Sequence, residues 1–186
     1  ALGLLAEASG SASNAIGWSA KATKQNATAI GSGATAVGDN ATAVGDEAKA
    51  NQAFSTALGY EAKSEAERST AIGMKALVKG ADSFAIGNGT QVTGAYSVAL
   101  GQEAKVNNSF SSAVGYMAKA DSSGSAAIGA WAETSGGDSA ALGNHAEASG
   151  SKSLALGNST KAIGSESLAL GLLAEASGSA SNAIGW

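Results

Sequence analysis

The sequence lacks the residues on which much enzyme and metal chemistry depends. It contains no cysteine, which excludes a disulfide framework and a thiolate metal site. The single histidine, His145, has no second histidine to complete a zinc site or a catalytic triad, and we interpret it as a surface turn residue. No basic run of the kind that binds nucleic acid is present. We therefore expect no enzyme, no cofactor, no metal and no nucleic-acid partner.

Large apolar side chains are also scarce. Aromatic residues make up 5% of the chain although 44% of it is hydrophobic, because much of that fraction is alanine. This composition argues against an ordinary globular core and predicts a narrow core of small groups. No run approaches the roughly 18 apolar residues of a membrane helix, and no signal peptide opens the chain. We expect no membrane contact within this chain, and any anchor to lie outside it.

One cluster, alanine then a branched aliphatic then glycine, returns fourteen times at intervals of 14 residues, from Ala1-Leu2-Gly3 to Ala183-Ile184-Gly185. A fixed short period is typical of arrays in which each unit stacks on its neighbours. Counting the alanine as position 1, the period predicts a single continuous segment over residues 1–186, with about 13 coils. Residues 1–18 reappear unchanged as 169–186, either as a longer natural duplication or by design of matching ends, and both alternatives indicate an excerpt of a longer fibre.

Each repeat contains the pattern of two short strands and two turns. The first strand reads as Ser97-Val98-Ala99-Leu100-Gly101, and the second, at positions 6 to 8, as Ala104-Lys105-Val106. Glycine recurs at position 10, where we expect a turn with positive φ. The helical alternative fails because the residues seven places after the aliphatic ones include Ser9, Glu65 and Asp121, which leaves no coiled-coil seam. The sequence predicts an all-β parallel solenoid.

Strand alternation gives the aliphatic residues at position 2 a separate role. Positions 13, 1 and 3 are small and share the inward face, whereas positions 14 and 2 point outward. Stacked coils would make position 2 an apolar stripe about 60 Å long, and burying it would contribute roughly 20 to 40 kcal/mol. We expect an obligate oligomer with this row at its interface. The row consists of Leu2, Ile16, Ile30, Val44, Leu58, Ile72, Ile86, Leu100, Val114, Ile128, Leu142, Leu156, Leu170 and Ile184.

A charged row at position 7 and aromatic residues at the turns form the remaining surface. We interpret the charged row as a solvated wall that keeps the protein soluble, with a specific ligand surface as the alternative. For the aromatic residues the alternatives are packing over coil edges between neighbouring chains and contact with a ligand. The candidate ligand-contact residues are Lys49, Lys63, Lys105, Lys119, Tyr60, Tyr116 and Trp131.

The repeat resembles the head domains of trimeric autotransporter adhesins, the YadA-like heads, whose motif reads roughly Asn-Ser-Val-Ala-Ile-Gly-x-x-Ser. Close copies are Tyr96-Ser97-Val98-Ala99-Leu100-Gly101, Asp82-Ser83-Phe84-Ala85-Ile86-Gly87 and Glu166-Ser167-Leu168-Ala169-Leu170-Gly171, and the match covers the whole chain. Position 6 is alanine or threonine here, where the family has serine. The resemblance implies a left-handed parallel β-roll that assembles as a homotrimer on the extracellular side of a bacterial outer membrane.

The same resemblance implies attachment to host extracellular matrix, cells or surfaces, and autoaggregation. Two alternatives stand beside this adhesive role. The first is a purely structural spacer that extends another binding tip. The second is an ice-binding solenoid, because Thr28, Thr42, Thr56 and Thr70 share position 14. That file ends at Phe84 and forms only one rank, which argues against ice binding.

Overall fold

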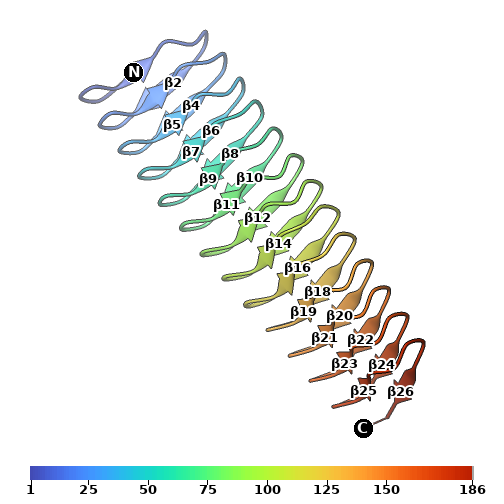
Figure 1. The fold of residues 1–186 in the computed structure, drawn as a ribbon. Coiled ribbons are helices and arrows are strands. Elements are labelled where there is room, and N and C mark those ends of the chain that lie inside the picture. The colour runs from blue at the N-terminus through green and yellow to red at the C-terminus, as the bar shows by residue number, and fades with distance from the viewer. Residues whose placement is uncertain (186) are drawn as a thin grey trace. The chain divides into compact units, whose positions relative to one another are not determined.

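The structure is a computed structural model that describes residues 1–185; Trp186, an aromatic residue at position 4, lies outside the described residues. The chain divides into two units of close internal contact, Ala1–Val92 and Thr93–Trp186, and each is described by itself. Within each unit, coils of 14 residues follow one another in chain order, as the colours of Figure 1 show. The prediction of one continuous segment over 1–186 stays a prediction.

The first unit forms two parallel sheets, one from the three-residue strands and one from the two-residue strands. The three-residue strands are β2 (Asn14–Ile16), β4 (Thr28–Ile30), β6 (Thr42–Val44), β8 (Thr56–Leu58), β10 (Thr70–Ile72) and β12 (Phe84–Ile86). The two-residue strands are β1 (Glu7–Ala8), β3 (Lys21–Ala22), β5 (Thr35–Ala36), β7 (Lys49–Ala50), β9 (Lys63–Ser64), β11 (Leu77–Val78) and β13 (Gln91–Val92). Neighbouring strands pair residues 14 apart, such as Thr56 with Thr70.

The second unit repeats the same arrangement. Its three-residue strands are β14 (Val98–Leu100), β16 (Ser112–Val114), β18 (Ala126–Ile128), β20 (Ala140–Leu142), β22 (Leu154–Leu156), β24 (Leu168–Leu170) and β26 (Asn182–Ile184). Its two-residue strands are β15 (Lys105–Val106), β17 (Lys119–Ala120), β19 (Glu133–Thr134), β21 (Glu147–Ala148), β23 (Lys161–Ala162) and β25 (Glu175–Ala176). With about 13 turns in all, 14 residues apart, the predicted all-β parallel solenoid is confirmed.

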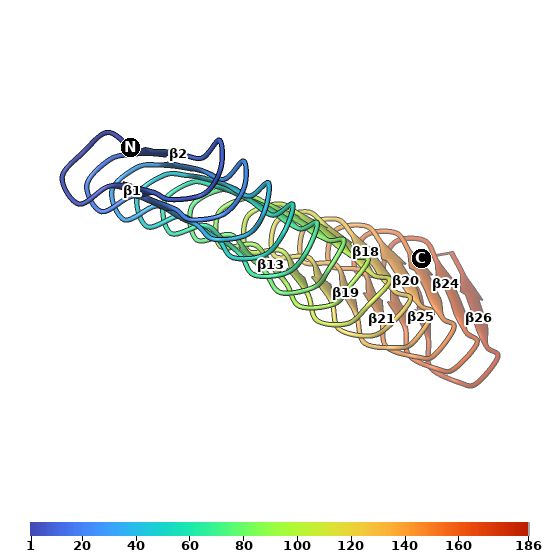
Figure 2. The ribbon, with the colours of Figure 1, turned by 90° about the horizontal axis from the view of Figure 1, so that it is seen from above.

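The interior of each coil is filled by small side chains, as the sequence predicts. The position-1 alanines Ala29 and Ala127 are fully buried, and so are the position-6 and position-8 alanines of most coils. The largest fully buried side chains are only valines, at Val78, Val92 and Val106. Figure 2 shows successive coils as open loops of similar size. The core is therefore narrow, and each coil closes around residues no larger than valine.

Two tight turns close each coil. In one, the Ala62 N–H donates to the Gly59 carbonyl at 3.2 Å, and in the other, the Ser55 N–H donates to the Gln52 carbonyl at 3.2 Å. The third residue of each turn has a positive φ, 54° at Glu61 and 56° at Phe54, as a type II turn requires. The left-handed residues therefore occupy positions 5 and 12. The expectation of positive φ at the position-10 glycines is wrong.

Position 10 favours glycine because successive coils approach each other there. A Cβ added to Gly150 would lie 2.0 Å from the carbonyl oxygen of Gly164 in the next coil. The glycine at position 3 has both constraints: Gly115 has a φ of +136°, and an added Cβ would lie 2.4 Å from the Gly129 carbonyl oxygen. These contacts explain why position 3 is glycine in every repeat.

Buried serines at position 13 fasten the second turn. The hydroxyls of Ser125, Ser139 and Ser153 each donate to the carbonyl oxygen three residues earlier, at 2.6 Å. Each bond gives a buried hydroxyl an acceptor for its proton. No helix within residues 1–185 is long and apolar enough to cross a membrane.

Candidate interaction surfaces

The outward face of the three-residue strands carries the aliphatic residues of position 2. In the first unit, Ile16, Ile30 and Ile86 expose 43%, 38% and 40% of their surface, and Val44, Leu58 and Ile72 are half-buried. The parallel register places each of these side chains beside its equivalent in the next coil, for example Ile30 beside Val44. Neighbours in the row thus cover part of each side chain and leave a continuous apolar strip in this unit.

In the second unit some position-14 residues widen the apolar face. Its position-2 row runs from Leu100 to Ile184, and position 14 adds Val98, Leu154 and Leu168 on the same side of the strands. In the first unit position 14 carries threonine in four successive strands, at Thr28, Thr42, Thr56 and Thr70. The sequence places position 14 on the same outward side as position 2, although only position 2 is named above as the expected interface row.

The two-residue strands carry the charged row. Lys49 and Lys63 are half-buried in the first unit, whereas Lys105 is exposed in the second. The Lys119 ammonium lies 2.5 Å from the Asp121 carboxylate and 2.9 Å from that of Glu133. Hydrogen bonds to Asp121 and then Glu133 hold the pKa of Lys119 above its usual value. Lys119 is therefore paired with two carboxylates of its own chain.

An ion pair also links coils in the first unit, at position 12. The Arg68 guanidinium forms two hydrogen bonds to Asp82, Nε to Oδ1 at 2.6 Å and Nη2 to Oδ2 at 2.8 Å. The hydrogen bond from Arg68 lowers the pKa of Asp82. The pair is solvent-exposed, so its main effect is to fix the relative position of two turns.

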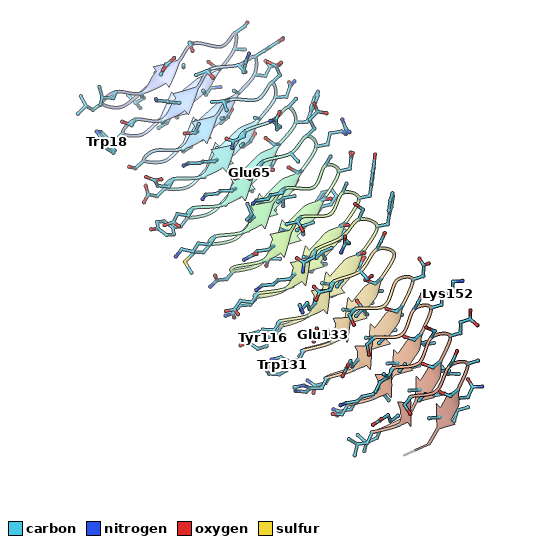
Figure 3. The ribbon with its side chains drawn as sticks, in the orientation of Figure 1. Trp18, Glu65, Tyr116, Trp131, Glu133 and Lys152 are labelled. Carbon is cyan, nitrogen blue, oxygen red and sulfur yellow. The ribbon has the colours of Figure 1, made fainter. Side chains whose placement is uncertain are left out.

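Three aromatic rings of the second unit gather at one corner of successive coils. The ring of Trp131 packs edge-on to Tyr116, with centroids 4.9 Å apart, and stacks on His145 at 4.9 Å with an interplanar angle of 8°. Figure 3 shows Tyr116 and Trp131 projecting from one side of the coils, with Lys152 on the opposite side. His145 is a turn residue, as interpreted, but it extends the aromatic cluster, and its spacing of 14 residues from Trp131 is the signal that was overlooked.

A groove lies beside this cluster. It has a volume of about 470 Å³ and is lined by Trp131, Glu133, His145, Ala146, Glu147, Ser159 and Lys161. In the first unit the equivalent corner holds Tyr60, whose hydrogen bond to Glu61, with the charges of Glu61, Asp46 and Glu47, raises the pKa of its hydroxyl. Both corners combine an aromatic ring with carboxylates.

The described residues contain no group of three or more histidine, aspartate or glutamate side chains placed to hold a metal ion. What this arrangement offers is surface: an uncovered apolar face, a charged wall and exposed aromatic corners on a rigid array. A parallel solenoid of this kind belongs to the class of proteins that act by presenting repeated surfaces to partners.

The chain belongs to the YadA head family. The family model "YadA head domain repeat (2 copies)" matches residues 8–34, 36–62, 50–76, 79–104, 108–132 and 135–160, which is well over half of the chain. The chain is also similar to the crystal structure of the collagen-binding domain of Yersinia adhesin YadA, with 30% identity over 82% of this chain and 69% of that chain and a TM-score of 0.41. No curated protein matches it.

Family membership confirms the resemblance stated from the sequence and supports an adhesin-like role. YadA-like adhesins are surface-exposed autotransporters of the outer membrane, and the family is one of adhesins rather than enzymes.

Proposed function

We propose that this chain is an adhesive head segment of a homotrimeric bacterial surface fibre. It attaches the cell to extracellular matrix proteins, host cells or surfaces, and mediates autoaggregation. The segment is continuous over residues 1–186 and acts on the extracellular side of the outer membrane without catalysis. The observation that carries the proposal is the uncovered aliphatic row on an array that belongs to a family of adhesins.

The aliphatic row supplies the driving force for trimer formation. Roughly three-fifths of the surface of Ile16, Ile30 and Ile86 is already covered within the single chain, since these residues are 43%, 38% and 40% exposed. Burying the remainder contributes about 0.6 to 1.2 kcal/mol for each side chain, or roughly 8 to 17 kcal/mol for the row. This is less than the sequence-based figure, which took every side chain as fully exposed. It is still enough to make folding and association depend on each other.

The ligand-contact surface is proposed to lie on the charged wall and aromatic corners, at Lys49, Lys63, Lys105, Lys119, Tyr60, Tyr116 and Trp131. A matrix protein is the class of ligand we propose, because the similar solved structure is a collagen-binding domain. Three chains would present each residue of this surface three times, so weak single contacts would combine into firm attachment.

The test combines light scattering with a binding panel. One chain has a mass of 17.8 kDa, and we expect the purified protein to have three times that mass. We also expect it to bind at least one of immobilised collagen, fibronectin and laminin. A folded monomer at micromolar concentration would contradict the trimer. A trimer that binds no matrix protein and no cell would instead identify a spacer that extends another tip.

A further inference from the structure

The groove beside His145 has a definite geometry within the second unit. Its lining residues come from positions 5 to 7 of three successive coils. The rings of Trp131 and His145 line it from position 5, and the outward side chains of Glu133, Glu147 and Lys161 line it from position 7. The groove therefore runs between two files of side chains, along the direction in which these coils stack.

The aromatic file ends at His145 and leaves room for one more planar group. Trp131 stacks on one face of the His145 ring. On the other side, the next position-5 residue is Ser159, which also lines the groove and has a side chain much smaller than a ring. The following one, Leu173, is two coils from His145, a separation of about 9 to 10 Å between backbones. A planar group can lie over Ser159 and continue the stack.

Two glutamates are neighbours along the rim. Glu133 and Glu147 are direct partners in the register of β19 and β21. Like charges placed opposite each other in this way destabilise a sheet. Lys119 lies 2.9 Å from Glu133 on the far side, but Lys161 approaches Glu147 only to 3.9 Å. The carboxylate of Glu147 is therefore the less tightly paired of the two and is open to a further cation.

The backbone gives no reason for large rings at this corner. Trp131 and His145 have φ values of 55° and 56°, in the left-handed region that favours glycine. Glycine does occupy the same position of the repeat at Gly33 and Gly89. The rings therefore do not serve the turn, which a smaller residue would form with less strain.

We propose that this groove binds an arginine side chain of a partner protein. The guanidinium group stacks on the free face of His145 over Ser159 and pairs with the carboxylate of Glu147. Guanidinium is planar, stacks on aromatic faces and matches a carboxylate with two parallel donors, whereas a lysine ammonium is a compact point charge. This inference rests on the proposed adhesive function and names the partner chemistry of one part of its surface.

The test compares two peptides that differ only in their cation, acetyl-Gly-Arg-Gly-Arg-Gly-amide and acetyl-Gly-Lys-Gly-Lys-Gly-amide, by tryptophan fluorescence and calorimetry. We expect saturable binding of the arginine peptide and binding of the lysine peptide that is at least about tenfold weaker. The protein has a net charge of −4, so it attracts both peptides without specificity. Equal binding of the two peptides overturns the proposal.

Matched variants locate the site. Glu147→Gln and His145→Ala should each weaken binding of the arginine peptide about tenfold or more. Glu175→Gln removes a carboxylate from the same row in β25, outside the groove, and should leave binding unchanged. Thermal melting checks that each variant is folded. Binding by His145→Ala or Glu147→Gln at the level of the unmodified protein overturns the proposal.

Light scattering on His145→Ala tests the alternative that a second copy of this chain occupies the groove. If this variant alone changes the mass of the assembly, the corner is a contact between copies of the chain, and the proposal is overturned. Failure of the groove to bind the peptide leaves the trimer and the matrix binding intact. Conversely, peptide binding without any matrix binding contradicts the proposed adhesive function and leaves the proposed arginine site standing.

Discussion

At the scale of the residue, the glycine at position 3 is the position where a substitution is most destabilising. We predict that Gly115→Ala destabilises the protein by about 3 kcal/mol or more, because the left-handed φ and the carbonyl contact act together. The measurement is urea denaturation at fixed protein concentration. Gly33→Ala is the control: its φ is +66°, but the nearest atom to an added Cβ is a Glu47 side-chain oxygen at 3.4 Å. A loss of about 1 kcal/mol is expected there. Equal losses in the two variants would contradict the close-approach argument.

The Arg68 and Asp82 pair makes a pH-dependent prediction at the same scale. The pKa of Asp82 is lower in the folded protein than in the unfolded chain. Its contribution to stability is therefore present above the unfolded value of about 3.9 and is lost as the pH falls through the folded value. We expect Asp82→Asn to lower the melting temperature slightly at pH 7.

The difference between Asp82→Asn and the unmodified protein should disappear at a pH well below the folded pKa. Arg68→Gln should lower the melting temperature at pH 7 less in the Asp82→Asn background than in the unmodified protein, because its pairing with Asp82 is already absent there. A difference that stays constant across this pH range would show that the carboxylate acts by packing and not by charge.

At the scale of the element, adjacent residues of one strand lie in different environments. Ala127 in β18 is fully buried, whereas its neighbour Ala126 points outward and is half-buried. We predict that Ala127→Leu destabilises the protein by about 1 to 3 kcal/mol through overpacking. Ala126→Leu should be tolerated, because leucine already occupies the same column at Leu154 and Leu168. Chemical denaturation compares them, and a similar cost for both variants would contradict the assigned facing.

The positions of the strands, and which of their side chains point inward, could be predicted from the sequence. Side chains of a strand alternate with a period of two, and every repeat has the same alternation. Positive φ was assigned to the wrong turn residue, because glycine can mark either a left-handed conformation or a close backbone contact. At Gly150 only the neighbouring coil decides between these, and that neighbour is 14 residues away.

At the scale of the whole molecule, the aliphatic row should control assembly. We predict that Ile86→Asp dissociates the trimer, because it places a charge in a face that must lose its water. Gln91→Asp adds the same charge at an exposed residue of β13 in the same coil and should leave the mass unchanged. Lys105→Ala should alter neither mass nor melting. Light scattering measures all three, and an unchanged mass for Ile86→Asp would contradict the proposed interface.

The sequence alone determined the period, the strands, the narrow core and the outward aliphatic row, because each depends on local alternation and on contacts that recur every 14 residues. Only the tertiary structure decided which side chains of different coils meet. The stack of Trp131 on His145, the opposition of Glu133 and Glu147 and the Arg68 pair depend on the side-chain directions that stacking imposes. The repeat therefore specifies the array, whereas the particular surface it presents arises from variable residues that stacking brings together.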